Sequence, residues 1–187
     1  MVSVENGSLS VPATTTFAVG AGFDVATGAG LTVNGNDISA VVGNKAYKAT
    51  NNAAGGTDYV LKESTTLAAQ FTVAGKDTLT IPEGVTVTMG NFKLGLGGKN
   101  IAINGKLIVA NNASSNLEFT STTEVSFGAK ATLEAAGNSA TITLNDGAKI
   151  KAESTTTMTA NGHASPIFSM TKDGTFKTVS SSGTVIG

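Results

Sequence analysis

The chain lacks two residue types on which many enzymes depend. None of its 187 residues is cysteine, and all twelve basic residues are lysines, so arginine is absent too. Without cysteine there are no disulfides, thiolate metal sites or thiol nucleophiles. Without arginine there is no planar guanidinium to bind phosphate or carboxylate through paired hydrogen bonds. These absences argue against phosphate-handling enzymes and against proteins that read bases in a DNA groove.

Charged and aromatic side chains are also scarce. Only 13% of the residues are charged, against about 25% in typical soluble domains, and 5% are aromatic, with no tryptophan. The net charge of −1 comes from sparse, interspersed groups, so we expect neither a nucleic-acid partner nor an anionic membrane surface. Small Gly, Ala, Thr, Ser and Asn residues take the place of the charged ones. Many bacterial and archaeal surface proteins have this composition.

Long hydrophobic runs are missing as well. No segment approaches the 18 or so apolar residues of a membrane-spanning helix. The opening residues have neither the basic nor the apolar region of a signal peptide. Hydrophobic residues nevertheless make up 40% of the chain, enough for one sizeable core. We therefore expect residues 1–187 to form a single β domain without a membrane span, located outside the cell or on its surface in a mature form.

An apolar pattern recurs along the chain at a constant spacing. Leu9 and Val11 recur as Leu31 and Val33. A longer set recurs in the same way, with the second four residues following the first four: Leu79, Ile81, Val85 and Val87, then Ile101, Ile103, Leu107 and Val109. An offset near twenty residues is typical of one coil of a solenoid. We predict that these eight residues stack in the core, with Ile81 over Ile103 and Val87 over Val109.

Short alternating segments separated by Gly and Asn predict strands and corners throughout. At about 3.3 Å per residue, a coil of this length accommodates three short strands and three corners. Residues 78–152 are the most regular part, whereas 36–77 are expected to be an irregular insertion or break, with a helical spacing near 61–70. Before residue 35, five strands are expected, around these apolar pairs: Val2 and Val4, Leu9 and Val11, Phe17 and Val19, Phe23 and Val25, Leu31 and Val33.

The fold class predicted is all-β, a parallel β-helix or β-solenoid with coils of about 22 residues. Asn-Gly steps such as Asn104-Gly105 also suit two-residue hairpins. The alternative is therefore a jelly-roll β-sandwich with strand donation, in which neighbouring strands pair in sequence order. In a solenoid, a strand pairs with its equivalent one coil later.

The strand-corner-strand segments 78–87 and 101–109 resemble the repeats of parallel β-helix surface proteins and adhesin passengers of bacteria or archaea. The pieces 116–119 and 140–148 look similar. The resemblance implies a right-handed parallel β-helix on the cell exterior and carries over no functional residue. Polysaccharide lyases and phage tailspikes share this fold, so the resemblance does not fix the function.

Few residues suggest chemistry. His163, the single histidine, has no neighbouring carboxylate in the sequence to orient it as a catalytic base. Glycosidic cleavage needs two facing carboxylates, for which Glu118 with Glu134, or Glu83 near Asn104-Gly105, are the candidates. We predict no enzyme activity and no cofactor. The alternative is a calcium site at aspartates in turns, where backbone carbonyl oxygens could complete the set of oxygen ligands. The candidate residues are Asp24, Asp58, Asp77, Asp146 and Asp173.

The leading hypothesis is a non-enzymatic structural subunit of an extracellular filament, sheath or surface layer. Its partner would be a second copy of the chain, joined by β-strand addition. The candidate donor strand is the N-terminal arm, whose alternating apolar residues are Val2, Val4, Leu9 and Val11. The alternatives are an adhesin or carbohydrate-binding module, a phage tail-type β-helix, and a polysaccharide-degrading enzyme on the same fold.

Overall fold

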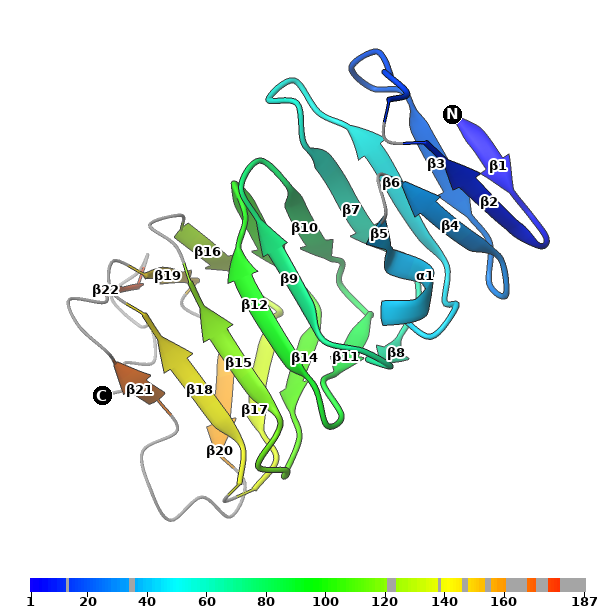
Figure 1. Cartoon of the computed structure of the whole chain (residues 1–187). Coiled ribbons are helices and arrows are strands. Elements are labelled where there is room, and N and C mark those ends of the chain that lie inside the picture. Colours follow the sequence, from blue (N-terminus) through cyan, green and yellow to red (C-terminus); the bar gives the residue numbers. More distant parts are fainter. Residues whose placement is uncertain are drawn as a thin grey trace.

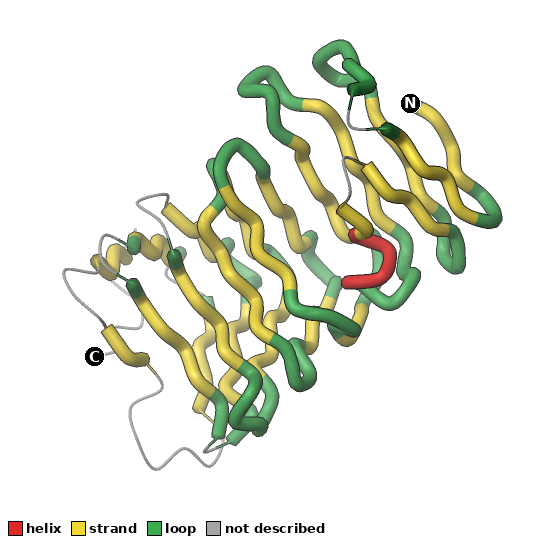
Figure 2. Tube along the Cα trace, in the orientation of Figure 1, coloured by secondary structure: helices red, strands yellow, loops and turns green. Residues whose placement is uncertain are grey.

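The chain forms an all-β parallel solenoid of about six turns, with about 23 residues per turn (Figure 1). This computed structural model describes residues 1–12, 14–33, 36–120, 124–137, 139–145, 148–153, 156–160, 168–170 and 175–178. The first strands lie at one end of the stack and the last strands at the other, and loops connect the short strands (Figure 2). The predicted solenoid is thus confirmed, and the jelly-roll alternative is wrong.

Three sheets run along the solenoid, and a fourth covers its N-terminal part. Sheet A has nine strands in this spatial order: β1 (Val2–Val4), β3 (Gly22–Val25), β6 (Tyr47–Asn51), β7 (Thr57–Leu61), β10 (Thr78–Ile81), β13 (Asn100–Ile103), β16 (Glu124–Phe127), β19 (Lys149–Ala152) and β22 (Thr175–Thr178). Sheet B contains β2 (Ser8–Val11), β4 (Gly30–Val33) and β5 (Asn36–Asp37).

Sheets C and D begin only after residue 64. Sheet C contains β8 (Thr65–Thr66), β11 (Thr86–Thr88), β14 (Lys106–Val109), β17 (Thr132–Ala135) and β20 (Thr157–Ala160). Sheet D contains β9 (Phe71–Ala74), β12 (Lys93–Gly97), β15 (Asn116–Phe119), β18 (Thr141–Leu144) and β21 (Phe168–Met170). From the pair of β7 with β10 onward, every described pairing is parallel and joins a strand to its equivalent one coil later, as the solenoid prediction requires.

The register confirms one predicted stack and corrects the other. Ile81 pairs with Ile103, as the constant repeat predicts. Val87, however, pairs with Leu107 and not with Val109, so the partner lies two positions earlier than predicted. A slip of two residues leaves every side chain on the same face of a strand, so apolar alternation alone cannot distinguish the two registers.

A shorter corner causes this slip. Four residues, 82–85, separate β10 from β11, whereas only Asn104 and Gly105 separate β13 from β14. The short corner lies so close to the preceding coil that a Cβ on Gly105 would meet the carbonyl oxygens of Val85 at 2.2 Å and Pro82 at 2.3 Å. Only glycine allows this approach of two backbones. Coils elsewhere are longer, since the step from Lys149 to its partner Thr175 exceeds the step from Ile81 to Ile103.

The N-terminal part departs from the coil pattern. β3 with β6, β6 with β7, and β4 with β5 pair antiparallel. A single short helix, α1 (Ile38–Val41), follows β5, and the Asp37 side chain accepts a hydrogen bond from the Ala40 N–H at 3.1 Å to cap it. The helical spacing near 61–70 marks no helix, because those residues run from the end of β7 through β8 and the loop after it.

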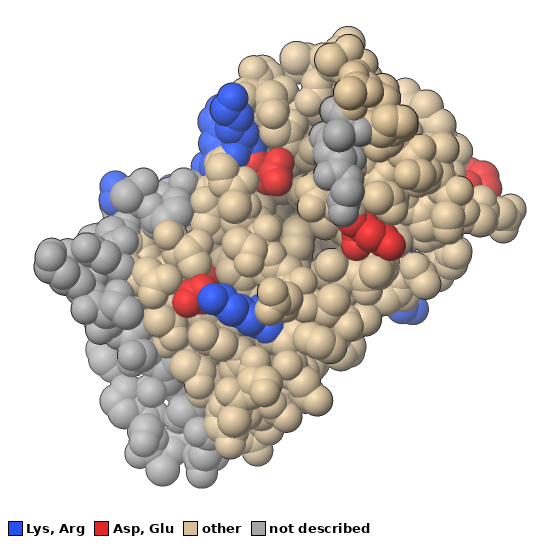
Figure 3. Space-filling model, in the orientation of Figure 1, with Lys and Arg blue, Asp and Glu red and all other residues tan. Residues whose placement is uncertain are grey.

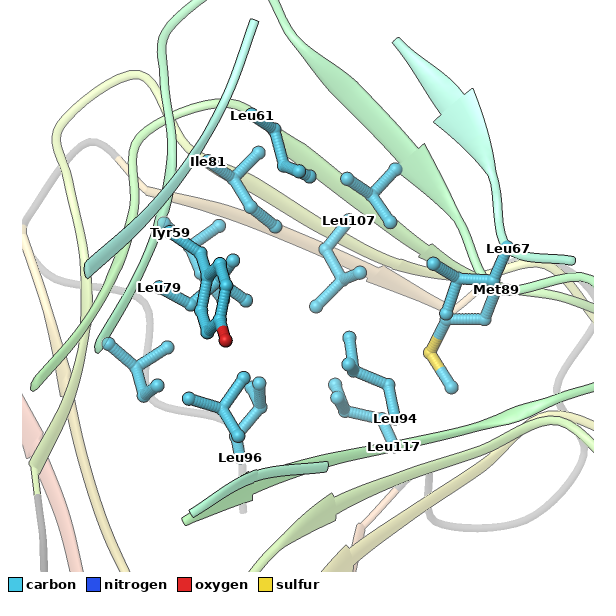
Figure 4. Packing of buried hydrophobic residues seen from close by; sticks show 14 of the residues in the cluster. Tyr59, Leu61, Leu67, Leu79, Ile81, Met89, Leu94, Leu96, Leu107 and Leu117 are labelled. Carbon is cyan, nitrogen blue, oxygen red and sulfur yellow. The ribbon is translucent and has the colours of Figure 1, made fainter. Parts of the chain in front are cut away.

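Side chains alternate between a buried interior and a half-exposed outer face. All eight residues of the predicted core stack are buried. Figure 4 shows Leu79, Ile81 and Leu107 pointing into a common interior together with Leu94 and Leu117 from the facing sheet. Burial of such side chains contributes about 1.5–3 kcal/mol each. Because no single coil could exclude water from its own apolar face, the stacking of coils stabilises the fold.

Candidate functional site

The N-terminal end of the solenoid is an open edge of two sheets. Within the described residues β1 pairs only with β3, and β2 pairs only with β4. Each strand therefore presents one side of its backbone without a neighbouring strand. Both strands lie at the same end of the molecule (Figure 1). Such an edge is a template for pairing with another chain. We refer to β1 and β2 together as the N-terminal edge.

Two apolar side chains on this edge are more exposed than the residues with which they pair in the next strand. Val2 is 54% exposed and Leu9 is 36% exposed, whereas their register partners Phe23 and Leu31 are 6% and 2% exposed. Val4 is already buried, and Val11 is partly buried against the core. A coil in mid-stack is covered on both sides, but the first coil is covered on one. One further strand per sheet would place Val2 and Leu9 in the interior environment.

No device that normally protects an edge is present on β1 or β2. Natural edges carry lysines, prolines or bulges that discourage pairing. Here the first lysine is Lys45, and Glu5, in the turn between the two strands, is the only charged side chain before Asp24. The exposed large hydrophobic residues of the described chain all precede β3; they are Met1, Val2, Leu9 and Val19. The two strands thus expose apolar side chains beside small serines and carry no charge, and Pro12 follows directly after β2.

The predicted donor arm is not free in the single chain. Val2 and Val4 belong to β1, and Leu9 and Val11 belong to β2, so the arm forms the first coil of its own molecule. The arm folds back because Phe23, Val25, Leu31 and Val33 offer it an apolar surface in parallel register. The same four arm residues therefore form an edge that could pair with a strand of another copy. If the arm detached from its own molecule, it could instead be the donated strand.

Segment 17–19 is not the strand that its alternation predicts. It forms part of a loop that Asn51 holds against the end of β6. The Asn51 N–H donates to the Ala21 carbonyl at 2.8 Å, and the Gly20 N–H donates to the Asn51 carbonyl at 2.8 Å. The Asn51 side-chain amide donates to the Phe17 carbonyl at 2.7 Å. Backbone groups of the loop are therefore hydrogen-bonded to Asn51 without forming a strand. Phe17 packs against Phe23, with ring centroids 5.4 Å apart.

The one candidate acid pair, Glu118 with Glu134, is divided between two sheets, whereas the corner that carries Glu83 lies against Asn104 and Gly105 as expected. Glu118 lies in sheet D and Glu134 in sheet C, and each binds a lysine of a neighbouring strand in its own sheet, Lys93 and Lys106 respectively. Glu83 pairs with Lys130 across two coils, at 2.6 Å. Charged side chains are sparse on the face shown in Figure 3. The structure therefore brings together none of the carboxylate pairs that sequence reasoning suggested for glycosidic cleavage.

The aspartates considered for calcium have partners within the protein where they are described. Asp24 lies between Lys62 at 2.6 Å and Lys48 at 3.8 Å. One Asp58 oxygen accepts hydrogen bonds from Thr78 at 2.7 Å and Asn52 at 2.9 Å, and Asp77 accepts one from the Thr57 N–H at 2.8 Å. The described residues contain no group of three or more potential metal-ligating side chains. Asp146, Asp173 and His163 lie outside the described residues.

A cavity of about 260 Å³ that is partly open to solvent lies in the N-terminal part of the solenoid. At this level sheet D has not yet begun, and residues of sheets A and B, α1 and the 14–21 loop line the cavity. The four aromatic residues on its wall are Phe17, Phe23, Tyr47 and Tyr59. Hydroxyl and amide groups of Thr15, Thr16, Asn36, Asn51 and Thr57 also line it. None of the described residues around this cavity is charged.

Burial raises the pKa of both tyrosines. The pKa of Tyr59 rises to about 12, mainly because its ring is buried and secondly because of the nearby Asp77. Burial is also the main reason that the pKa of Tyr47 is raised, although its hydrogen bond to Ser39, 3.0 Å between oxygens, acts in the opposite sense. The Leu31 N–H donates to the same Ser39 oxygen at 3.0 Å. Both phenols therefore keep their protons to a higher pH than an exposed tyrosine does.

Sequence reasoning did not find this cavity. Its signal was weak, because both tyrosines of the chain fall in the irregular segment 36–77, where no repeat predicts which residues face each other. The clustering of the only two tyrosines within one break in the pattern was the available hint.

Comparison with protein-family models, with curated proteins and with solved structures gave no significant match. Among the described residues, no helix has the length and apolar character needed to cross a membrane. Conclusions about function therefore come from the chain's own residues.

Proposed function

We propose that the protein is a non-enzymatic structural component of an extracellular assembly, joined to its neighbours by strand addition at the N-terminal edge. The observation that carries this proposal is the coincidence of two features. The strands β1 and β2 lack a neighbour on one side, and the exposed large hydrophobic residues of the described chain all precede β3. Strand addition would pair the free backbone groups of β1 and β2 and would bury exposed hydrophobic side chains on these strands.

Topology favours a head-to-tail arrangement of copies. Sheet A runs through the whole molecule from β1 at one end to β22 at the other. β1 is parallel to β3, and β22 is parallel to β19. If β22 of one copy paired in parallel with β1 of the next, sheet A would continue across the junction. A contact between two different surfaces that does not close into a ring generates an open filament.

The composition supports the extracellular part of the proposal. The chain is free of cysteine and poor in charge, and the fold is a parallel β-solenoid, which is the architecture of the surface proteins that its repeats resemble. A filament, a sheath and a surface layer would all use the same edge. An adhesin shaft or a phage tail-type β-helix would use the solenoid as a spacer instead.

The test is to introduce a lysine at positions that the added strand would cover. Val2→Lys and Leu9→Lys put a charge on side chains that are exposed in the single molecule and would be buried in the assembly. Val19→Lys is the matched control, because Val19 is 67% exposed and lies outside both edge strands. The unmodified chain and the control should form large species as concentration rises, measured by light scattering and sedimentation. The two edge variants should remain monomeric.

Circular dichroism of the edge variants should match that of the unmodified chain, which shows that they are folded. A chain that stays monodisperse at every concentration, or edge variants that assemble like the control, would refute strand addition at this edge.

A further inference from the structure

The row of inward-facing residues across sheet A contains one conspicuously small member. Phe23 pairs with Ala49, Ala49 pairs with Tyr59, and Tyr59 pairs with Leu79. The row continues with Ile101 and further branched residues, so Ala49 alone leaves a gap of most of a side chain. The missing volume lies where sheet D also provides no strand. These two absences together produce the cavity of about 260 Å³.

The spacing of this gap selects a flat or ring-shaped occupant. Adjacent strands lie about 4.8 Å apart, so the strands that carry Phe23 and Tyr59 are separated by roughly 9.6 Å. A ring between two side chains needs a contact distance of about 3.5–4 Å on each of its faces. The sum of these two distances is smaller than the separation between the strands, so one ring fits between them. An engineered apolar cavity of about 150 Å³ is large enough to bind benzene. The cavity here therefore has room for one ring with a substituent.

The lining also limits the charge and polarity of the occupant. None of the described residues around the cavity carries a charged side chain, and a tyrosine phenol, with an ordinary pKa of about 10, is neutral at physiological pH. An ion would lose part of its hydration without gaining an oppositely charged partner among the described lining residues, which disfavours charged occupants. Thr15, Thr57 and Asn51 nevertheless supply hydroxyl and amide groups that can bond one polar substituent.

We propose that this cavity binds a small neutral monocyclic molecule that carries a hydroxyl or similar polar group. Its ring lies over Ala49 between Phe23 and Tyr59, and the 14–21 loop, held by Asn51, forms one wall of the site. The proposal is independent of strand addition, since Ala49 and Tyr59 lie on β6 and β7 and not on the edge strands.

The sequence provides its own reporter for this test. The chain has no tryptophan, and both of its tyrosines line the cavity, so fluorescence excited in the tyrosine band, above the absorption of phenylalanine, arises from this site alone. The probe is cyclohexanol, which does not absorb where tyrosine is excited. Cyclohexylamine and cyclohexanecarboxylate keep the same ring and add a positive or a negative charge, and methyl glucoside is a strongly polar ring. We expect a saturable fluorescence change and an increase in Tm with cyclohexanol only.

Two variants test the location. Ala49→Leu fills the gap and should weaken cyclohexanol binding at least tenfold, while Ala102→Leu, the same change on the outer face of β13, should leave binding within twofold of the unmodified chain. Phe17→Ala removes part of the cavity wall, lies outside the strands and should also weaken cyclohexanol binding. This variant still tests the location if Ala49→Leu fails to fold.

Several outcomes would overturn the proposal. These are the absence of any saturable response to cyclohexanol, an equal response to the charged analogues, a preference for methyl glucoside, or undiminished binding by folded Ala49→Leu and Phe17→Ala.

Discussion

Neighbouring residues on one strand have opposite roles in this protein. In β14, Leu107 is fully buried in the interior while Ile108, the next residue, lies half-exposed on the outer face. The two side chains have the same number of atoms and the same backbone environment. Their contributions to stability differ because only one of them is removed from water and packed.

The first prediction compares these two positions. Leu107→Ala should lower the free energy of unfolding by about 2–5 kcal/mol, because it removes buried methyl groups and leaves a cavity. Ile108→Ala should cost below about 1 kcal/mol, since the outer face is already in contact with water. Urea denaturation followed by circular dichroism measures both. Equal costs would show that the inward and outward faces of β14 have been assigned wrongly.

The second prediction concerns alkaline pH. Tyr59 has a pKa of about 12 in the folded chain, and a tyrosine in the unfolded chain has a pKa of about 10. The unfolded state therefore loses its proton first, and stability falls as pH rises from about 10 to 12. Below that window the phenol is protonated in both states and has no effect on the pH dependence.

Tyrosinate absorbance during a pH titration measures this ionisation directly. The folded chain should titrate well above the same chain in concentrated urea. Tyr59→Phe should lose less stability than the unmodified chain over the alkaline window. A titration midpoint that is identical in the folded chain and in urea would contradict the buried position of Tyr59.

Much of the residue-scale pattern could be predicted from alternation, because an inward residue has to be apolar. All eight predicted core residues are buried for this reason. The importance of Ala49 could not be predicted, because a small residue leaves a gap only relative to its neighbours across the sheet. Those neighbours, Phe23 and Tyr59, are known only once the antiparallel pairings of β6 are known.

At the scale of the element, the corners determine which residues lie side by side. The two-residue corner at Asn104 and Gly105 shifts the pairing of β11 with β14 by two positions relative to that of β10 with β13. A longer and a shorter offset therefore occur within the same coil. A solenoid tolerates such changes because corner length alters the path between sheets and leaves the ladders within each sheet intact.

The third prediction tests this register with engineered cysteines, which have no native thiols to compete with. Thr88→Cys with Ile108→Cys places two thiols on paired positions. Their Cα atoms should be about 4.8 Å apart, which lies within the range that a disulfide spans. This pair should cross-link readily under mild oxidation, as measured by free-thiol titration and non-reducing electrophoresis.

The matched control pairs Thr88→Cys with Ala110→Cys, the partner that Thr88 would have if β11 and β14 kept the offset of Ile81 and Ile103. Moving two residues along a strand adds about 6.6 Å, which takes the Cα atoms beyond disulfide reach. Preferential cross-linking of this control pair would show that the uniform repeat is right and the short corner wrong.

Element positions from residue 78 onward could be predicted well, since turn residues and alternation agree there. Segment 17–19 could not, because its alternation is real but the hydrogen bonds from Asn51 hold it as a loop. The position of α1 was also missed. Four residues capped by Asp37 make too short a helix to show a helical period in the sequence.

At the scale of the whole molecule, the central feature is a sheet that runs from end to end and stops at an uncharged edge with exposed apolar side chains. Interior coils are stabilised by neighbours on both sides, whereas the first coil has one neighbour. Repeat proteins depend on such nearest-neighbour contacts and usually need polar caps at their ends. The N-terminal edge carries no charged residue, although Ser3, Ser8 and Ser10 on its two strands are exposed.

The fourth prediction concerns the forces at the junction between copies. Residues 1–12 contain Glu5 as their only charged side chain and β22 contains Lys177, so the contact would consist mainly of backbone hydrogen bonds and apolar burial. Raising the ionic strength should therefore leave the sedimentation profile of the assembled protein nearly unchanged, because salt screens charge pairs and not apolar contacts. Dissociation at high salt would indicate a charge-driven interface elsewhere on the molecule.

The most direct test of strand addition between copies is X-ray diffraction from aligned, assembled protein, with electron micrographs of the same sample. Sheets that continue across each junction place every strand perpendicular to the filament axis. The account predicts filaments with a sharp reflection at about 4.7–4.8 Å along that axis. Monodisperse particles at all concentrations, or filaments that lack this axial reflection, would contradict it.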